Sequence, residues 1–287
     1  MPEADPRRLA AFGFLLPSMA FWPSSIGKEA VMVLGIGLVA NGAARQWTGA
    51  RGGMALVAGG LGVTALVRPH ITLLLVAALL GAVMVTRWDA VGSSDPLRKV
   101  ASIGILVGLL IASVVLANSF FEIDTSSGEQ LSDVFEQTEE RTDRGGSTFE
   151  TSGPLLFPWT VVTVLFRPFP FEATNFQTAI TSLETTFLLV VTIARRRVLG
   201  RLVRSCRQLP MVAFVLVFGA LFVLAYSNFG NFGILARQRV QLYPLLVGLL
   251  CVPTTWPNLR LPGPGWSADR RGGREAAGLE AIRGARR

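Results

Sequence analysis

The sequence predicts an all-α protein: a polytopic integral membrane bundle of about eight helices, with a polar loop and an interfacial helix on its outer side. The composition is the first observation behind this prediction. Hydrophobic residues make up 51% of the 287 residues and charged residues only 16%, with a mean hydropathy of +0.48. The second is that the apolar residues form runs separated by short polar or basic connections, as membrane helices require.

Eight apolar runs within residues 1–252 are the predicted helices, and several are shorter than the ~20 residues that a straight span needs. Val100–Phe120 is the clearest span, whereas Leu9–Trp22 and Val240–Val252 need polar flanks to reach the membrane surface. In chain order the runs are Leu9–Trp22, Glu29–Ala44, Met54–Val67, Ile71–Thr86, Val100–Phe120, Phe176–Ala194, Pro210–Tyr226 and Val240–Val252.

A secretory signal is the alternative for the first run. Arg7 and Arg8 would form its basic region, Leu9–Leu16 its apolar core and Ser18-Met19-Ala20 a small-residue cleavage site. The core is short and is interrupted by Gly13 and Pro17, so we favour a membrane helix.

Basic residues set the predicted orientation. When the N-terminus is placed inside, all but seven of the 27 Lys and Arg residues fall on inner connections or on the C-terminal tail. This is the positive-inside pattern, and it puts both termini on the cytoplasmic side of the membrane. The seven outer residues are Lys28, Arg68, Arg141, Arg144, Arg167, Arg237 and Arg239. They oppose the usual bias, and an anion at the outer face, such as a phosphate, is the simplest reason for them.

The outer loop, residues 121–175, is the one long polar connection. Ser127 and Gln130 are spaced like a capping box and predict a short surface helix within Glu122–Gly153. Pro154–Phe166 is apolar but too short to span, so it should lie in the outer interface or re-enter the membrane. Residues 253–287 are rich in Gly, Pro and Arg and predict a basic, disordered cytoplasmic tail.

Composition and residue spacing also argue against nucleic-acid binding, a disulfide and a metal site. The formal charge of +8 and the pI near 10.8 come from inner connections and the tail, so anionic membrane lipids explain them and nucleic acid is not expected. Cys206 and Cys251 both map to the inner side, which predicts no disulfide. One His and two scattered Cys have no metal-ligand spacing, so neither a metal nor another cofactor is expected.

Four short motifs, in order along the chain, carry a resemblance. They are Leu16–Glu29 with its Phe-Trp-Pro-Ser-Ser sequence, Val67–His70, Leu165–Glu172 and Asn231–Arg239. From about Leu15 to Val252 the chain resembles bacterial, largely actinobacterial, multi-span proteins of surface-polysaccharide synthesis. That group is similar to membrane glycosyltransferases of the GT-C class and to Wzy-type polymerases. The resemblance implies a polyprenyl-phosphate or polyprenyl-pyrophosphate sugar as substrate, used at the outer face.

The chain departs from those enzymes in its first outer stretch. Pro17–Lys28, with Glu29 after it, has no carboxylate pair of the kind that GT-C enzymes carry there. We therefore expect either an N-terminally shortened form of such a protein or a catalytic acid elsewhere in the chain.

The residue chemistry predicts a phosphate site independently. Guanidinium groups in a low-dielectric crevice stabilise a leaving group that gains negative charge. The predicted phosphate-binding residues are Lys28, Arg68, Arg167, Arg237 and Arg239, and the four arginines should converge on one outer cavity. Arg237 and Arg239 are expected to open a helix after Gly233, whose positive end would add to the site. The predicted catalytic acid–base residues are Glu29, His70 and Glu184.

Structural roles compete with each of these assignments. Lys28 and Glu29 can simply cap a helix, Arg68-Pro69-His70 can be a tight hairpin, and Glu184 can pair with an outer arginine. Two other functions stay open. A non-catalytic partner in an envelope-glycan assembly complex fits the same features, whereas a lipid or solute transporter should show two related halves, which the sequence lacks.

Overall fold

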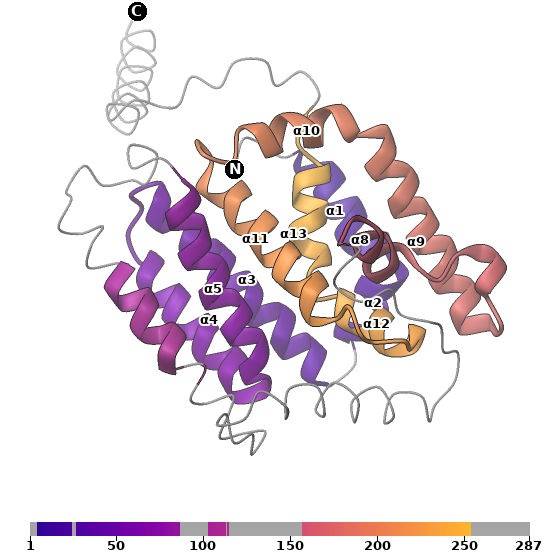
Figure 1. The fold of residues 1–287 in the computed structure, drawn as a ribbon, viewed down its shortest axis with the longest axis horizontal. Coiled ribbons are helices and arrows are strands. Elements are labelled where there is room, and N and C mark those ends of the chain that lie inside the picture. Colours follow the sequence, from indigo (N-terminus) through magenta and orange to yellow (C-terminus); the bar gives the residue numbers. More distant parts are fainter. Residues whose placement is uncertain (1–4, 25–26, 87–102, 113, 115–156, 254–287) are drawn as a thin grey trace, which may run out of the picture. The chain divides into compact units, whose positions relative to one another are not determined.

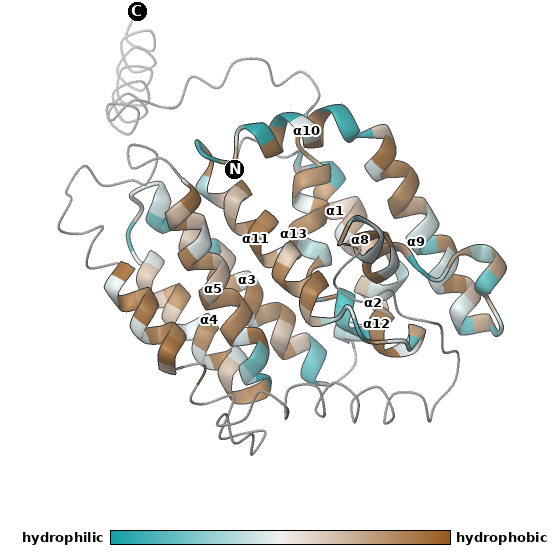
Figure 2. Ribbon diagram, in the orientation of Figure 1, coloured by the Kyte–Doolittle hydropathy of each residue, from teal (hydrophilic) through white to brown (hydrophobic). Residues whose placement is uncertain are grey.

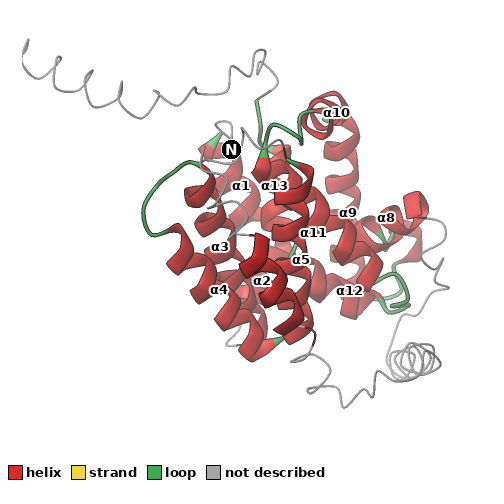
Figure 3. Cartoon of the chain, turned by 60° about the vertical axis from the view of Figure 1, so that its left-hand side comes forward, coloured by secondary structure: helices red, strands yellow, loops and turns green. Residues whose placement is uncertain are grey.

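The computed structural model of the chain describes residues 5–24, 27–86, 103–112, 114 and 157–253. These residues form helices joined by turns and contain no strand, which confirms the all-α prediction for this part of the chain (Figure 3). Residues 254–287 form a separate unit that lies outside the described residues, as does most of the predicted outer loop.

The N-terminal part contains five helices: α1 (Pro6–Leu15), α2 (Pro17–Ser24), α3 (Lys28–Trp47), α4 (Gly53–Val67) and α5 (Pro69–Val85). Asp5 begins α1, because its carboxylate accepts a hydrogen bond from Arg7 N. Arg68 separates α4 from α5: Pro69 has no N–H to continue α4, yet its fixed φ suits the first turn of α5.

The C-terminal part contains α8 (Phe157–Phe166), a short 3-10 turn η3 (Pro170–Glu172), α9 (Phe176–Ala194), α10 (Arg196–Arg204), α11 (Pro210–Ala225), α12 (Phe232–Arg239) and α13 (Tyr243–Leu250). Asn175 and Asn231 begin α9 and α12, because their side-chain oxygens accept the free N–H groups of the first turn. Residues 103–112 form one further helix.

α11 forms the centre of the core. It packs against α3, α5, α8, α10 and α13, and in Figure 1 it runs between the α3–α5 group and the α8–α9 group. Phe214, Phe218 and Phe222 of α11 are fully buried, and their rings follow one another along the helix. This helix is apolar on every side, as a core helix should be.

Glycines bring α3 and α4 unusually close together. A Cβ at Gly60 would lie 2.6 Å from Gly35 O, and a Cβ at Gly42 would lie 2.6 Å from Gly53 O. Only hydrogen can occupy these positions, so the two backbones touch at the start and again at the middle of α4.

Five predicted runs match observed helices within about three residues at each end: α3, α4, α5, α9 and α11. The prediction of one helix over Leu9–Trp22 is wrong. Pro17 cannot donate to the helix and forces extended backbone at Leu16, so α1 and α2 are separate. The prediction of a helix from Val240 is also wrong, because Val240–Leu242 form a turn and α13 begins only at Tyr243. Of Val100–Phe120, residues 103–112 are helical and most of the rest lies outside the described part.

Few of the helices are long. Among the described residues, α9 alone meets the length and apolarity of a membrane-crossing helix, with α2 and α3 as a second if this pair, bent by 109°, is one broken span. α4, α5 and α11 are apolar but have 15, 17 and 16 residues. Figure 2 shows how continuously apolar these helices are. The arrangement of eight spans stays a prediction.

Candidate functional site

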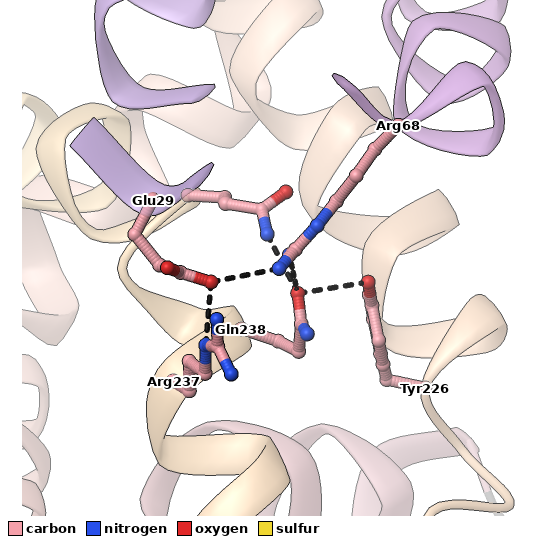
Figure 4. A network of polar contacts seen from close by, with 6 residues as sticks. Glu29, Arg68, Tyr226, Arg237 and Gln238 are labelled. Atoms are coloured by element: carbon pink, nitrogen blue, oxygen red, sulfur yellow. Dashed lines mark hydrogen bonds and ion pairs between the residues drawn. The ribbon is translucent and has the colours of Figure 1, made fainter. Parts of the chain in front are cut away.

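Arg68 reaches the centre of a polar network because of where α4 ends. The helix stops at Val67, and the Arg68 side chain leaves the end of the α4–α5 pair beside α3 and α12 (Figure 4). Its Nη2 donates to Glu29 Oε1 at 2.7 Å, and its Nη1 donates to Gln238 Oε1. One guanidinium therefore ties the start of α3 to the end of α12.

Glu29 is the only carboxylate of this network. It lies in the first turn of α3, where the unpaired N–H groups favour a negative charge, and it is only 2% exposed. Its Oε1 accepts from Arg68 Nη2 and also from Arg237 Nε, the latter at 2.5 Å. Sharing one oxygen between two guanidinium groups stabilises Glu29 as a carboxylate.

Gln238 completes the network on the α12 side. Its Oε1 accepts from Arg68 Nη1, from Gln241 Nε2 at 2.6 Å and from Tyr226 Oη at 3.3 Å. Tyr226 follows α11 directly, so the network joins the ends of α3, α4, α11 and α12 (Figure 4). We name this set, Glu29, Arg68, Tyr226, Arg237, Gln238 and Gln241, the Glu29 network.

The Glu29 network carries excess positive charge. Two guanidinium groups face one carboxylate, while the Gln and Tyr side chains are neutral, so the formal balance is one positive charge. Arg68 is nearly buried, but the Arg237 side chain is 44% exposed and its guanidinium lies 5.8 Å from the Trp22 ring centroid. Only Nε of Arg237 is hydrogen-bonded within the described part of the chain, so its two Nη groups can bind an external anion.

Arg239 lies elsewhere, although it is only two residues further along. Residues two apart on an α-helix point about 200° apart. Arg239 is therefore fully buried on the other side of α12, where its Nε donates to Val164 O in α8. Its Nη1 and Nη2 make no hydrogen bond of good geometry among the described residues, but Tyr243 of α13 is close enough to interact with the guanidinium, more strongly than Glu184 does.

The prediction that Arg237 and Arg239 open a helix is wrong. Asn231 begins α12, and both arginines lie in its last turn, at the end where carbonyl groups are unpaired. That end favours the two cations but offers no N–H groups to a phosphate. The structure separates the two arginines, so they do not form one fork.

Glu184 has a structural role in this arrangement. It is buried in α9, its Oε2 accepts from Ser18 N at 3.0 Å, and its Oε1 accepts from Ser18 Oγ. Ser18 lies in the first turn of α2, so a carboxylate from a distant helix caps α2. The structure shows no hydrogen bond between Glu184 and the Glu29 network among the described residues.

The remaining predicted residues lie around the network rather than in it. Arg167 donates from Nε to both oxygens of Glu172, at 2.9 and 3.2 Å, and its guanidinium lies 5.5 Å from the Phe232 ring centroid at the start of α12.

His70 is half-buried, two residues after Arg68. Lys28 is exposed in the first turn of α3, beside Glu29. Arg141 and Arg144 lie outside the described residues.

Glu172 shows how such a carboxylate is stabilised. Burial raises its pKa, but the hydrogen bonds from the Arg167 guanidinium and from Phe169 N outweigh this effect and hold the pKa below its usual value. Both partners come from the same turn, so this pair fixes the connection from α8 to α9.

Sequence reasoning missed the amide and phenol members of the site. Gln238 and Gln241, three residues apart beside Arg237, were a usable signal, whereas Tyr226 only ends a long apolar run. Within the described ranges, no group of three His, Cys, Asp or Glu side chains could hold a metal ion.

Comparisons with protein-family models, with curated proteins and with solved structures find no match for this chain. The resemblance to membrane glycosyltransferases and polymerases therefore stays a prediction.

Proposed function

We propose that this chain is a multi-pass membrane protein of the cell envelope whose Glu29 network binds the phosphate of a lipid-linked sugar, and that it transfers or polymerises this sugar. The observation that carries the proposal is the geometry around Glu29. Two arginines from distant elements meet at one carboxylate, with a net positive charge and with the Nη groups of Arg237 open.

The pattern of α9 supports the membrane placement. A helix at the surface of a soluble protein exposes its polar face and buries its apolar face. α9 does the reverse: it buries Thr178, Ser182, Glu184 and Thr185. The large residues that it exposes are Phe176, Ile180, Leu183, Phe187, Val190 and Ile193. An apolar stripe along the whole exposed face is what a lipid environment requires.

Other helices show the same exposure. Leu66 at the end of α4 is 88% exposed and Met84 near the end of α5 is 69% exposed. Isolated exposed apolar residues are common in soluble proteins, but those of α4, α5 and α9 belong to helices with almost no charge on any side. We therefore assign α4, α5, α9 and α11, together with the α2–α3 pair, to the membrane.

The chemistry follows from the charge of the network. Arg237 would bind phosphate oxygens with its two Nη groups, while Arg68 and Glu29 hold it in place. As the sugar leaves, the phosphate gains negative charge, and fixed guanidinium groups stabilise that charge best where water is scarce. Glu29 bonds both arginines and is a poor base, and Glu184 caps α2, so His70, two residues after Arg68, is the remaining predicted candidate for acid–base work.

The test compares arginine with lysine at position 237. Lysine keeps the charge but cannot bind two oxygens with a planar fork, so Arg237→Lys should be nearly as harmful as Arg237→Ala. Each variant is expressed in a strain lacking the native protein, and the surface glycan and its lipid-linked precursor are measured. Loss of polymer with accumulation of precursor supports the proposal. The matched control is Arg51→Lys with Arg51→Ala, an exposed arginine of the turn between α3 and α4, which should leave both quantities unchanged.

A non-catalytic partner in envelope-glycan assembly is the second candidate. It is favoured by the commitment of Glu29, the one carboxylate of the network, to two arginines. Normal polymer in Arg237→Lys and in Arg237→Ala, with both proteins present in the membrane, would reject the enzyme and favour the assembly partner.

A further inference from the structure

α10 is an amphipathic helix with an apolar side and a strongly basic side. Val198 and Leu202, one turn apart, are almost fully buried and attach it to the neighbouring helices α9 and α11. Its four arginines, Arg196, Arg197, Arg201 and Arg204, lie on the basic side and are all exposed. Val203, 49% exposed, lies among them.

The helix lies at the end of the bundle opposite the Glu29 network. α3 begins at Lys28, beside Glu29, and ends at Trp47, whose ring lies 6.3 Å from that of Phe214, in the first turns of α11 just after α10. Arg195, at the start of α10, donates to Val252 O at 2.8 Å, and Asp5 N donates to Cys251 O at 3.2 Å. These contacts bring the start of α1, the end of α3 and the end of α13 to the α10 end (Figure 1).

Charge at this end is almost entirely positive. Besides the α10 arginines, it holds Arg7, Arg8, Arg45, Arg51, Arg195 and Arg207. The four acidic residues that the structure describes are Asp5, Glu29, Glu172 and Glu184, and only Asp5 lies here. Asp5 is already bonded to Arg7 N and Arg8, so it neutralises little of the surface.

We infer that the exposed side of α10 is a binding surface for the headgroups of anionic phospholipids at the inner membrane face. α10 follows directly after α9, whose apolar exposed stripe continues to Ile193 and ends as the arginines begin. In a membrane, α10 therefore lies at headgroup depth, with its axis along the surface. There Val203 can reach the acyl boundary while the arginine side chains bind phosphates. The inference rests on the membrane placement proposed above, but not on sugar transfer.

The experiment measures thermal unfolding of the purified full chain in nanodiscs of phosphatidylcholine, with and without phosphatidylglycerol. Phosphatidylglycerol should raise the Tm of the wild-type protein by at least about 2 °C, and added salt should reduce this shift. The triple variant Arg196→Gln/Arg197→Gln/Arg204→Gln should lose most of the shift. Among the described residues Arg196 and Arg204 bond only to Ile193 O and Gly200 O of neighbouring turns, so their substitution leaves the described tertiary hydrogen bonds intact.

Two matched variants exclude alternative explanations of the shift. One tests whether the site needs the planar arginine fork, and the other tests whether phosphatidylglycerol acts at the Glu29 network. The corresponding triple Lys variant should retain the shift, because a headgroup surface needs charge rather than a planar fork. Arg237→Gln, at the other end of the molecule, should also retain it, whatever it does to glycan synthesis. An unchanged shift in the triple Gln variant overturns the inference. So does a wild-type protein whose Tm ignores phosphatidylglycerol but rises with a DNA oligonucleotide, which would identify a nucleic-acid surface instead.

Discussion

Arg237 and Arg239 are separated by one residue, and the helix sends their side chains to different surroundings. Arg237 is the exposed member of the otherwise largely buried Glu29 network, so its guanidinium can meet a ligand. Arg239 faces α8 and α9, where it can only hold helices together. Sequence reasoning grouped them because both are arginines in one short motif, and the rotation of about 100° per residue decides otherwise.

The free energy of unfolding should fall by different amounts when each of these two arginines is replaced by alanine. Arg239→Ala removes a large, fully buried side chain and leaves a cavity and an unbonded Val164 O, so the free energy of unfolding should fall by about 2–5 kcal/mol. Arg237→Ala should change it by less than about 1 kcal/mol, because Glu29 keeps Arg68 as its partner. Thermal unfolding in one detergent measures both, and equal losses would contradict the assignment.

The anion expected at the Glu29 network can be tested without knowing the substrate. Glu29→Gln leaves two guanidinium groups without a shared carboxylate, so the variant should have a lower Tm than the wild-type protein. Inorganic pyrophosphate should restore part of this loss, because it supplies the missing negative charge. The restoration should vanish in Glu29→Gln/Arg237→Ala, and equal restoration in the double variant would place the anion elsewhere.

Glu172 gives a dependence on pH. Its pKa is lower in the folded protein than the ordinary value of 4.5, so it stabilises the fold above that pH. This contribution falls as the pH drops below 4.5 towards the folded pKa, where the carboxylate is protonated and the hydrogen bonds from Arg167 weaken. Tm measured from about pH 6 down to about pH 3 should therefore fall less steeply in Glu172→Gln than in the wild-type protein. Parallel curves would show that other carboxylates dominate.

At the scale of elements, the sequence predicted helices wherever the apolar run was long and uninterrupted. α9 matches its predicted range at both ends, because Asn175 begins it and the arginines after Ala194 end its apolar run. The predictions failed at Pro17 and before Pro244, where a proline interrupts a short apolar run. Proline lacks the N–H that would continue a helix, and hydropathy alone does not reveal this. The Glu29 network could be predicted only in part: charge identified Glu29, Arg68 and Arg237, but nothing in the local sequence indicates that α11 ends beside them at Tyr226.

The close contact of α3 and α4 gives a prediction with a neighbouring control. Gly60→Ala would bring a Cβ within 2.6 Å of Gly35 O and 2.8 Å of Val39 N, both backbone atoms. Separating the helices should cost about 1–3 kcal/mol of stability. Gly59→Ala in the same helix has no atom within 4 Å of its Cβ and should be neutral or stabilising. The free energies of unfolding of Gly60→Ala and Gly59→Ala, measured under one condition, test the contact. Equal effects would mean that the two helices do not touch at Gly60.

At the scale of the whole molecule, the helices divide its charge between two ends. α3 runs from the Glu29 end to the α10 end, α4 returns, and the pairing of Arg68 with Glu29 closes this hairpin. α9 and α11 connect the same two ends. In the membrane placement proposed above, the positive-inside pattern would put the basic α10 end in the cytoplasm and the mixed Glu29 end outside.

Accessibility of introduced cysteines tests this assignment. The native thiols are removed first, because Cys206 is half-buried beside α10 and would report on that side, whereas Cys251 is fully buried. In the Cys206→Ser/Cys251→Ala background, Asn228→Cys lies in the turn between α11 and α12, close to Tyr226. Ser205→Cys lies directly after α10. An impermeant thiol reagent applied to intact cells should label Asn228→Cys and leave Ser205→Cys unlabelled until the cells are permeabilised. Labelling of Ser205→Cys in sealed cells would show that the orientation is the opposite one, with α10 outside. The Glu29 network would then lie on the cytoplasmic side and could not bind a substrate used at the outer face.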